Sequence, residues 1–420
     1  MRSPPTLAAV NVPPPQLTSS AELFVLELGR ALHTAGTPAD RLEDALAHVT
    51  RRLALEAHVF STPTALMVAF GPLASQRTHL LRVSPADVDL DHLDRLDGVA
   101  RRVTRGELSP EGGIAAIEVI CGESRRLGVV GLLATHVVMA AAWARLFGGG
   151  LAEVAIAALI GLLVGALSVV WPRVTTGAPV LELLASVVAS FLSGAAAVVF
   201  AHLQIPVSVY VATLAGVVAL LPGFSLTVAV TELATRNLAS GTARVTAAGM
   251  TLLQMAVGVA LGERLATTVL GPVAAVAPDP LPAWTEFVAL TLSPFVVASF
   301  TRAPRRHILA VLVVSVVGYG AARLGGDVLG RELGAFVGAF AVGLVSRLHA
   351  ARRQCPQMIT LVPAILLLVP GSFGFRSVSS FLGADVTSGI DAAIKMMLIA
   401  MAIAAGLLVA QAPGRRRASL

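Results

Sequence analysis

Hydrophobic residues dominate the chain from about residue 127 onward, where long apolar segments alternate with short polar ones. A helix needs about 20 mainly apolar residues to cross a bilayer. By this measure the pattern predicts ten membrane spans: 127–147, 151–171, 180–201, 205–221, 243–263, 284–301, 307–323, 332–348, 357–370 and 390–411. The expected fold of this part is an all-α polytopic membrane protein.

A different pattern precedes the spans and predicts a small cytoplasmic α/β domain over residues 21–124. Leu42, Leu46 and Val49 recur at helical spacing, and Thr37 before them is the expected N-cap. The other predicted elements are helices at 21–35, 88–105 and 110–121 and strands at His58–Phe70 and Thr78–Val83. Residues 1–20 are rich in proline and small residues and predict a disordered tail without a signal peptide.

Two short segments of the membrane region resemble each other. Leu221-Pro222-Gly223 opens the first, which runs to Gly241, and Val369-Pro370-Gly371 opens the second, which runs to Gly389. In both, 19 positions separate the proline from the final glycine. Each Pro-Gly pair breaks a helix, because proline removes a backbone donor and glycine permits a sharp turn. Repeated breaks within apolar sequence are typical of a transporter's substrate site, so both segments are expected to be re-entrant or amphipathic.

Arginine positions predict the orientation of the spans. Arginines gather in alternate loops, among them Arg173, Arg302 and Arg352. Because cytoplasmic loops carry the positive charge, both termini are expected inside. Five spans in each half would then invert the second repeat relative to the first. The predicted divisions are the first repeat, the second repeat and a basic cytoplasmic tail, at residues 125–272, 284–411 and 412–420.

Composition supports a membrane protein and argues against several other classes. The chain is 55% hydrophobic, has a mean hydropathy of +0.80 and carries a net charge of +6. Aromatic residues make up only 5%, too few for the stacking platforms of a nucleic-acid-binding protein. Cys121 and Cys355 are isolated in the sequence, so no disulfide framework, metal site or cofactor is expected. With no catalytic motif either, we do not expect an enzyme.

Polar residues near the two breaks are the candidates for transport. A helix that starts at a break presents its positive end, which suits a carboxylate, while nearby hydroxyls suit an ammonium or hydroxyl group. The candidate substrate and transport residues are Pro222, Gly223, Ser225, Thr227, Glu232, Pro370, Gly371, Ser372, Arg376 and Asp385. Carboxylates at membrane depth are also candidates for proton coupling, first of all Glu232 and Asp385. Glu182, and Asp391 with Lys395, are further candidates, either for coupling or for a structural ion pair. The hydroxyls have an alternative role in satisfying backbone groups that the kinks release.

Together these features resemble the bacterial threonine/serine exporter family over about residues 21–410. The resemblance rests on Ala35-Gly36-Thr37-Pro38, on Ser61-Thr62-Pro63-Thr64, and on the two Pro-Gly segments with Arg376. It implies a cytoplasmic N-terminal domain fused to ten spans in a bacterial inner membrane. It also implies export of threonine and serine driven by the proton motive force. In related members the two parts are separate chains and the substrate is a dicarboxylate such as succinate, which is the alternative substrate here.

Two other function classes stay open. In a membrane-anchored enzyme or sensor, residues 21–124 would carry the activity, although they contain no phosphate loop, catalytic order or metal cluster. A channel would share the hydrophobic pattern but would not move substrate against a gradient. The expected partners are a small-molecule substrate, protons and the lipid bilayer, without nucleic acid, and a homo-oligomer is left open.

Overall fold

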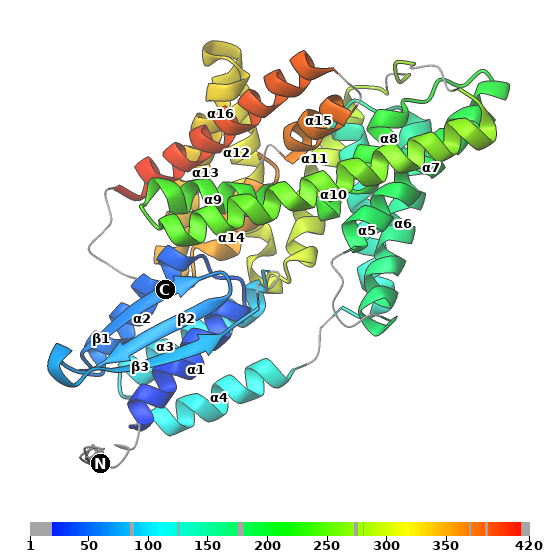
Figure 1. The fold of residues 1–420 in the computed structure, drawn as a ribbon. Coiled ribbons are helices and arrows are strands. Elements are labelled where there is room, and N and C mark those ends of the chain that lie inside the picture. Colours follow the sequence, from blue (N-terminus) through cyan, green and yellow to red (C-terminus); the bar gives the residue numbers. More distant parts are fainter. Residues whose placement is uncertain are drawn as a thin grey trace, which may run out of the picture.

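The computed structural model describes residues 19–84, 88–123, 127–174, 180–272, 276–279, 281–368, 371–382 and 385–412. A small α/β region at the N-terminus lies against one side of a larger region made of helices (Figure 1).

Four helices and three strands form the N-terminal region. In chain order they are α1 (Ser20–Thr34), α2 (Ala39–Arg52), β1 (Ala57–Thr62), β2 (Ala65–Phe70), β3 (Arg77–Arg82), α3 (Leu90–Thr104) and α4 (Pro110–Gly122). The strands form an antiparallel sheet in the order β1-β2-β3. Alternate residues of β2, Leu66, Val68 and Phe70, are buried in one core with Leu42 and Leu46 of α2. The predicted α/β class and the apolar face of α2 are confirmed.

One predicted strand proves to be two. The run His58–Phe70 folds into β1 and β2, joined by a tight turn at Pro63-Thr64 that pairs Thr62 with Ala65. Strand-forming residues on both sides of Pro63 look like one strand and hide the turn. Pro63 itself marks the turn, because a proline has no amide proton and is excluded from a central ladder.

The predicted cap of α2 is also wrong. The N-cap is Pro38, which makes no side-chain hydrogen bond, and the Thr37 hydroxyl is buried without a partner among the described residues. The acceptor comes instead from the membrane region, since the Ala39 amide donates to Glu232 Oε1 at 3.0 Å. A long-range contact has replaced the local cap.

Twelve helices of the described chain build the membrane region. The first half contains α5 (Val129–Leu146), α6 (Leu151–Val174), α7 (Leu181–His202), α8 (Val209–Gly216), α9 (Gly223–Ala234) and α10 (Leu238–Leu270). The second contains α11 (Trp284–Phe300), α12 (Ile308–Leu329), α13 (Arg331–Arg353), α14 (Met358–Leu366), α15 (Gly371–Leu382) and α16 (Val386–Gln411). Eight segments of the described chain are long and apolar enough to cross a membrane, or nine with the bent pair α8 and α9. The chain is a mostly helical, multi-pass membrane protein.

The predicted count of ten spans is reproduced only in part. Helix α11 lies where a span was predicted but has 17 residues, fewer than the other candidates. The predicted span 205–221 stops early, because α8 ends at Gly216 and the segment Val218–Ala234 continues at an angle of 51°. Helix α10 has 33 residues and begins at Leu238, so the predicted break segment 223–241 is almost entirely helical.

Large apolar side chains cover the outside of this bundle, and small residues lie where its helices touch. Large apolar side chains such as Val130 and Leu324 are 81% and 70% exposed, as lipid-facing residues would be. Small residues allow helices to approach inside. Where α10 meets α7, a Cβ on Gly258 would come within 2.9 Å of the Ser186 Cβ, and Gly262 meets the next turn of α7 in the same way.

The two halves of the membrane region pack in the same order. In the first half the contacting pairs are α5–α6, α6–α7, α5–α8, α6–α8, α7–α8, α7–α10 and α9–α10. In the second they are α11–α12, α12–α13, α11–α14, α12–α14, α13–α14, α13–α16 and α15–α16. The halves also exchange contacts reciprocally, α9 with α16 and α10 with α15. Each helix pair thus has a counterpart six helices later.

Ion pairs and apolar contacts dock the N-terminal region onto this bundle. Asp89 and Asp94 at the start of α3 pair with Arg302 and Arg306 of the α11–α12 linker. Arg101 of the same helix donates to the backbone of the α13–α14 linker. Phe224 of α9 and residues Met358, Val362 and Leu366 of α14 join the core of the N-terminal region.

Loops alternate between the two ends of the bundle. The end of α9 and the linkers α11–α12 and α13–α14 contact the N-terminal region. At the far end of α10, the backbone of Asp279 reaches Gly150 in the α5–α6 loop. Ser208 of the α7–α8 loop joins this end through Glu153. Arg145 and Thr285 are in hydrogen-bond contact there as well, at 2.5 Å.

Candidate functional site

The first helix break lies where the sequence placed it. Helix α8 ends at Gly216, a single 3₁₀ turn covers Val218–Leu220, and α9 starts at Gly223 with Pro222 as its N-cap. Pro222 makes no side-chain cap, so the first amides of α9 have no local acceptor from it. Amides at the positive end of a helix suit an anion.

The second break also separates two short helices. Helix α14 ends at Leu366 and α15 starts at Gly371, with Pro363 inside α14. Pro370, the other half of the predicted dipeptide, lies outside the described residues.

The two breaks meet in space. A Cβ placed on Gly371 would lie 3.4 Å from the Gly223 Cα, 3.4 Å from the Leu221 Cβ and 3.6 Å from the Gly223 amide nitrogen. Both glycines are buried. The N-termini of α9 and α15, 148 positions apart in the chain, thus converge on one place, beside Phe375, whose ring is 1% exposed.

Hydroxyl groups near the junction mostly bond to backbone. Thr227 Oγ1 donates to the Gly223 carbonyl at 3.2 Å, and Thr231 repeats this one turn later. Ser377 Oγ donates to the Gly389 carbonyl of α16 at 2.8 Å. Ser225 and Ser372, in the first turns of α9 and α15, are partly exposed. Their partial exposure makes these two hydroxyls candidates to face a ligand.

Glu232 lies away from the junction, at the end of α9 that faces the N-terminal region. It is fully buried and satisfied on both oxygens: Oε1 accepts from the Ala39 amide, and Oε2 accepts from Ser240 Oγ at 2.9 Å. Arg244 Nε lies 3.1 Å from Oε2 and donates to Oε1 at 3.2 Å. The carboxylate therefore links three elements, α2, α9 and α10.

Two further carboxylates of α2 surround this link. Burial raises the pKa of Asp40, and burial is also the main cause that raises the pKa of Glu43, to which the charge of Glu232 contributes. Glu43 Oε1 accepts the Ser61 amide at 2.7 Å. The N-terminus of α2 and Glu232 thus form an acidic cluster between the two regions, with Arg244 as its cation.

Residues Arg376 and Asp385 lie on the surface near α15 and α16. Arg376 is exposed, and Asp385 is the N-cap of α16, where it accepts the Ser388 amide at 3.1 Å. Hydrogen bonds from Ser388 lower the pKa of Asp385, with a smaller effect from Arg376. A carboxylate in this position stabilises the start of a helix.

The remaining predicted candidates are separate from the junction. Glu182 lies in the first turn of α7, and its Oε2 is buried without a hydrogen-bond partner within the described chain. Lys395 Nζ and Asp391 Oδ2 form a 2.8 Å pair on α16 whose side chains are 40% and 58% exposed. The sequence paired these two residues correctly, but their pair lies on the outer surface.

Sequence reasoning missed a buried carboxylate and a cluster of titratable groups. Glu153 is fully buried and accepts the Gly150 amide at 2.8 Å and the Ser208 amide at 2.6 Å. Its signal was local, since an acid three residues after a glycine run is a typical helix cap. Cys355, expected to be isolated, lies beside His307 and His349. No local signal marks this cluster, because its members come from three separate segments.

Two models of one protein family match the sequence. Residues 23–266 match the model described as "Putative threonine/serine exporter". Residues 286–412 match the model described as "Threonine/Serine exporter, ThrE". The first range covers the N-terminal region with the first half of the bundle, and the second range covers the second half.

Three similar proteins are fungal. An uncharacterized protein of Schizosaccharomyces pombe is 27% identical over 384 residues, which cover 88% of this chain and 45% of the relative. Pheromone-regulated membrane protein 10 of Zygosaccharomyces rouxii is 25% identical, over 88% of this chain and 39% of its own length. The protein of that name in Saccharomyces cerevisiae is 24% identical, over 91% and 53%. The chain spans about half the length of the curated relatives it matches, and no solved structure matches it.

Proposed function

The chain belongs to the threonine/serine exporter family, and we propose that it exports threonine and serine as a secondary transporter. Membership in this family supports a transporter and argues against an enzyme. The proposal adds the substrate site and the mechanism to what the family name states.

The observation that carries the proposal is the convergence of the two breaks. Threonine and serine each present a carboxylate, an ammonium group and a hydroxyl. The uncapped N-terminus of α9 supplies amides and a positive dipole end for the carboxylate. Gly223 and Gly371 keep the opposing backbones close, and Ser225 and Ser372 supply hydroxyls on either side. These amides and hydroxyls suit a small zwitterionic substrate that carries a hydroxyl group.

Alternating access would follow if the two halves are inverted repeats. The duplicated order of helix packing supports the repeat. The alternation of loops between the two ends supports an odd number of spans in each half, and hence the inversion. We propose ten spans on this basis, with α11 and the bent α8–α9 pair as the short or broken members, both termini in the cytoplasm and a bacterial inner membrane as the location.

Protons are the proposed driving ion. A coupling carboxylate must be able to lose its charge during the cycle. Among the candidates Glu182 fits best, because one of its oxygens is buried without a partner among the described residues, whereas Glu232 is satisfied on both oxygens and Asp385 caps a helix. Glu232 and its neighbours instead attach the N-terminal region to α9, which makes that region a candidate gate.

A dicarboxylate exporter is the second candidate, and one observation favours it. Two helix N-termini converge at the junction, so each could receive one carboxylate of a substrate such as succinate. Of the described junction residues Gly223, Ser225, Gly371 and Ser372, none is a carboxylate that could pair with the ammonium group of an amino acid.

Efflux measurements separate these possibilities. Cells or vesicles that contain the protein are loaded with labelled threonine, serine or succinate, and efflux is followed with and without a proton uncoupler. Uncoupler-sensitive efflux of threonine and serine is expected. Selective efflux of succinate would favour the second candidate, and efflux equal to that of vesicles without the protein for all three would contradict both.

A further inference from the structure

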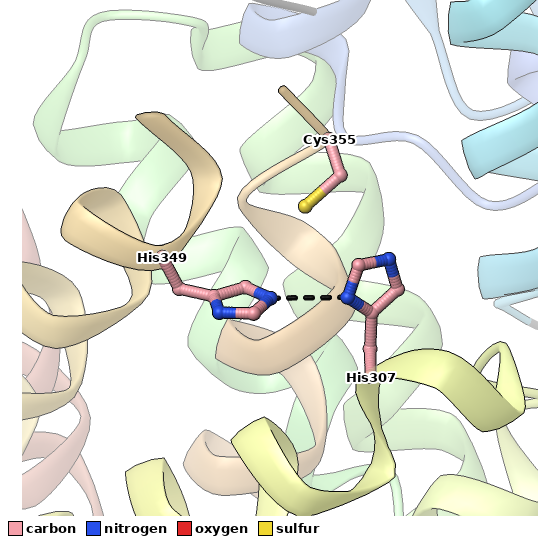
Figure 2. Close-up of side chains that lie close together, drawn as sticks. All are labelled: His307, His349 and Cys355. Carbon is pink, nitrogen blue, oxygen red and sulfur yellow. Dashed lines mark hydrogen bonds between the residues drawn. The ribbon is translucent and has the colours of Figure 1, made fainter. Parts of the chain in front are cut away.

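Three metal-binding side chains meet where the bundle contacts the N-terminal region. One ring nitrogen of His307, one ring nitrogen of His349 and the Sγ atom of Cys355 all lie within 4.8 Å of one another. Figure 2 shows the two imidazole rings turned toward each other, with the sulfur above the gap between them. His307 and Cys355 are buried, at 4% and 3% exposed, and His349 is partly buried.

Backbone features hold each of the three in place. His307 is the last residue of the 3₁₀ turn Arg305–His307 and the N-cap of α12. His349 lies in the last turns of α13. Gln354 ends α13 in a left-handed conformation, with φ of 52°, and so turns Cys355 back toward the helix, where its amide donates to the Ala350 carbonyl at 3.3 Å. The backbone positions from which the three side chains extend are therefore fixed by the ends of helices α12 and α13.

The hydrogen bonds define the state of the cluster without a cation. Arg306 Nε donates to His307 Nε2 at 3.1 Å, so the proton of neutral His307 is on Nδ1. That proton is shared with His349 Nε2 at 3.0 Å. Burial, together with the charges of Asp94 and Asp97, raises the pKa of the Cys355 thiol to about 11, which leaves the thiol neutral.

We propose that His307, His349 and Cys355 bind a transition-metal cation of the zinc class. Two imidazoles and one thiolate suit Zn²⁺ and its neighbours, whereas Mg²⁺ and Ca²⁺ require oxygen ligands. With tetrahedral bonds of about 2.0–2.3 Å, two nitrogens are about 3.3 Å apart and nitrogen and sulfur about 3.6 Å apart. The two nitrogens are 3.0 Å apart and all three ligand atoms lie within 4.8 Å of one another, so small side-chain shifts would give this geometry. A fourth position is left for water.

Binding involves proton movement and no electron transfer. The cation takes the place of the proton between the two rings, and the His307 proton moves from Nδ1 to Nε2. Arg306 then gives up its contact with Nε2 and keeps its ion pair with Asp94. The thiol proton leaves to solvent as the thiolate binds, so one proton is released per ion at neutral pH.

The position of the site suggests what the cation would do. It would join the α11–α12 linker, the end of α13 and the α13–α14 linker. The same segments carry Arg302, Arg306 and the Gln354 carbonyl, which bind α3. A bound cation would therefore fix the surface on which the N-terminal region is docked.

The test is a titration of the full-length protein with Co²⁺, a spectroscopic substitute for Zn²⁺. The protein is purified in detergent and treated with chelator beforehand. One Co²⁺ per chain is expected, with the absorption bands of a four-coordinate site and a sulfur-to-cobalt charge-transfer band, and Zn²⁺ should remove both by displacement. Cys355→Ser should abolish the charge-transfer band and weaken Co²⁺ binding by at least about tenfold.

Cys121→Ser is the matched control, because Cys121 is the other cysteine of the chain and is exposed on α4. It should leave both the affinity and the spectrum unchanged. His349→Asn, at a partly exposed position, should also weaken Co²⁺ binding about tenfold or more. This variant provides the test if Cys355→Ser does not fold. Absence of Co²⁺-dependent absorption in the wild-type protein, or a charge-transfer band that survives Cys355→Ser, would overturn the proposal.

Discussion

The partners of each carboxylate decide what that carboxylate can do in this chain. Glu232 and Glu153 are both fully buried, yet each oxygen of Glu232 and each oxygen of Glu153 accepts a hydrogen bond. Asp391, by contrast, is more than half exposed beside Lys395. Buried charges persist only when they are paired and hydrogen-bonded, so the first two are structural anchors between segments that are distant in sequence.

Loss of the Glu232 charge should destabilise the attachment of the N-terminal region. Glu232→Gln leaves Arg244 without its partner and weakens the contact with the Ala39 amide. Breaking a buried pair costs about 3–5 kcal/mol; because Arg244 is 22% exposed and can hydrate, we expect about 1–3 kcal/mol. Thermal unfolding and limited proteolysis in detergent would measure the loss. Asp391→Asn, which removes an exposed pair, should cost less than about 1 kcal/mol, and equal losses in both variants would count against this role of Glu232.

Asp97 should make stability depend on pH. Burial raises its pKa from 3.8 to about 7, although Arg101 Nη1 lies 2.8 Å from Oδ2. The folded state then holds a proton that the unfolded chain has already lost. This contribution to stability is fully present below about pH 4 and is lost as the pH rises through about 7.

Unfolding temperatures measured across this pH range would test the prediction. The unfolding temperature of the wild type should fall more steeply with rising pH than that of Asp97→Asn, whose side chain does not titrate. Asp44→Asn, at an exposed position of α2, is the control and should follow the wild type. Parallel curves for all three proteins would show that Asp97 does not contribute.

At the scale of elements, the two broken helices meet glycine to glycine. A Cβ on Gly371 would already be in van der Waals contact with the Gly223 Cα, at 3.4 Å, so the larger side chain of Gly223→Leu or Gly371→Leu should push the two helix starts apart. We expect transport to fall at least about tenfold with membrane insertion intact, since about 1.4 kcal/mol suffices for such a change. Efflux of labelled threonine, normalised to the amount of protein in the membrane, is the measurement.

Gly320→Leu on α12 is the matched control for this substitution. It introduces the same side chain into a membrane helix, but nothing lies within 4 Å of its Cβ position. Transport should be close to that of the wild type. If the variants at positions 223 and 371 export as well as this control, the breaks serve only as scaffold.

At the scale of the whole molecule, the order of the spans sets which loops face the cytoplasm. Arg305, in the α11–α12 linker, is exposed beside the N-terminal region. Val276 is exposed beyond the C-terminal end of α10, at the end of the bundle that lies away from the N-terminal region. The proposed inverted arrangement puts these two positions on opposite sides of the membrane. In a background without cysteine, Val276→Cys should react with an impermeant thiol reagent in intact cells. Arg305→Cys should react only after permeabilisation, and the reverse result would contradict the arrangement.

The sequence anticipated the fold where the signal was periodic or local. Helices α3 and α4, the apolar face of α2 with Leu42 and Leu46, and the break at Pro222-Gly223 all lie where predicted. Prediction from the sequence failed where a residue distant in the chain makes the hydrogen bond that a local residue was expected to make. Thr37 looked like a cap, but Glu232 accepts the Ala39 amide because docking brings that carboxylate to the end of α2. It failed also at Pro63-Thr64, where a continuous strand pattern concealed a turn.

The sequence by itself determined the class of this protein. Long apolar segments must be helices in lipid, because backbone groups there have no water to bond, and proline with glycine must break those helices. Only the tertiary structure decided which residues meet. It brings Gly371 to Gly223, Glu232 to the start of α2, and Cys355 to two histidines from other segments. These encounters depend on how helices far apart in the chain pack together, and periodicity along one segment carries no information about that.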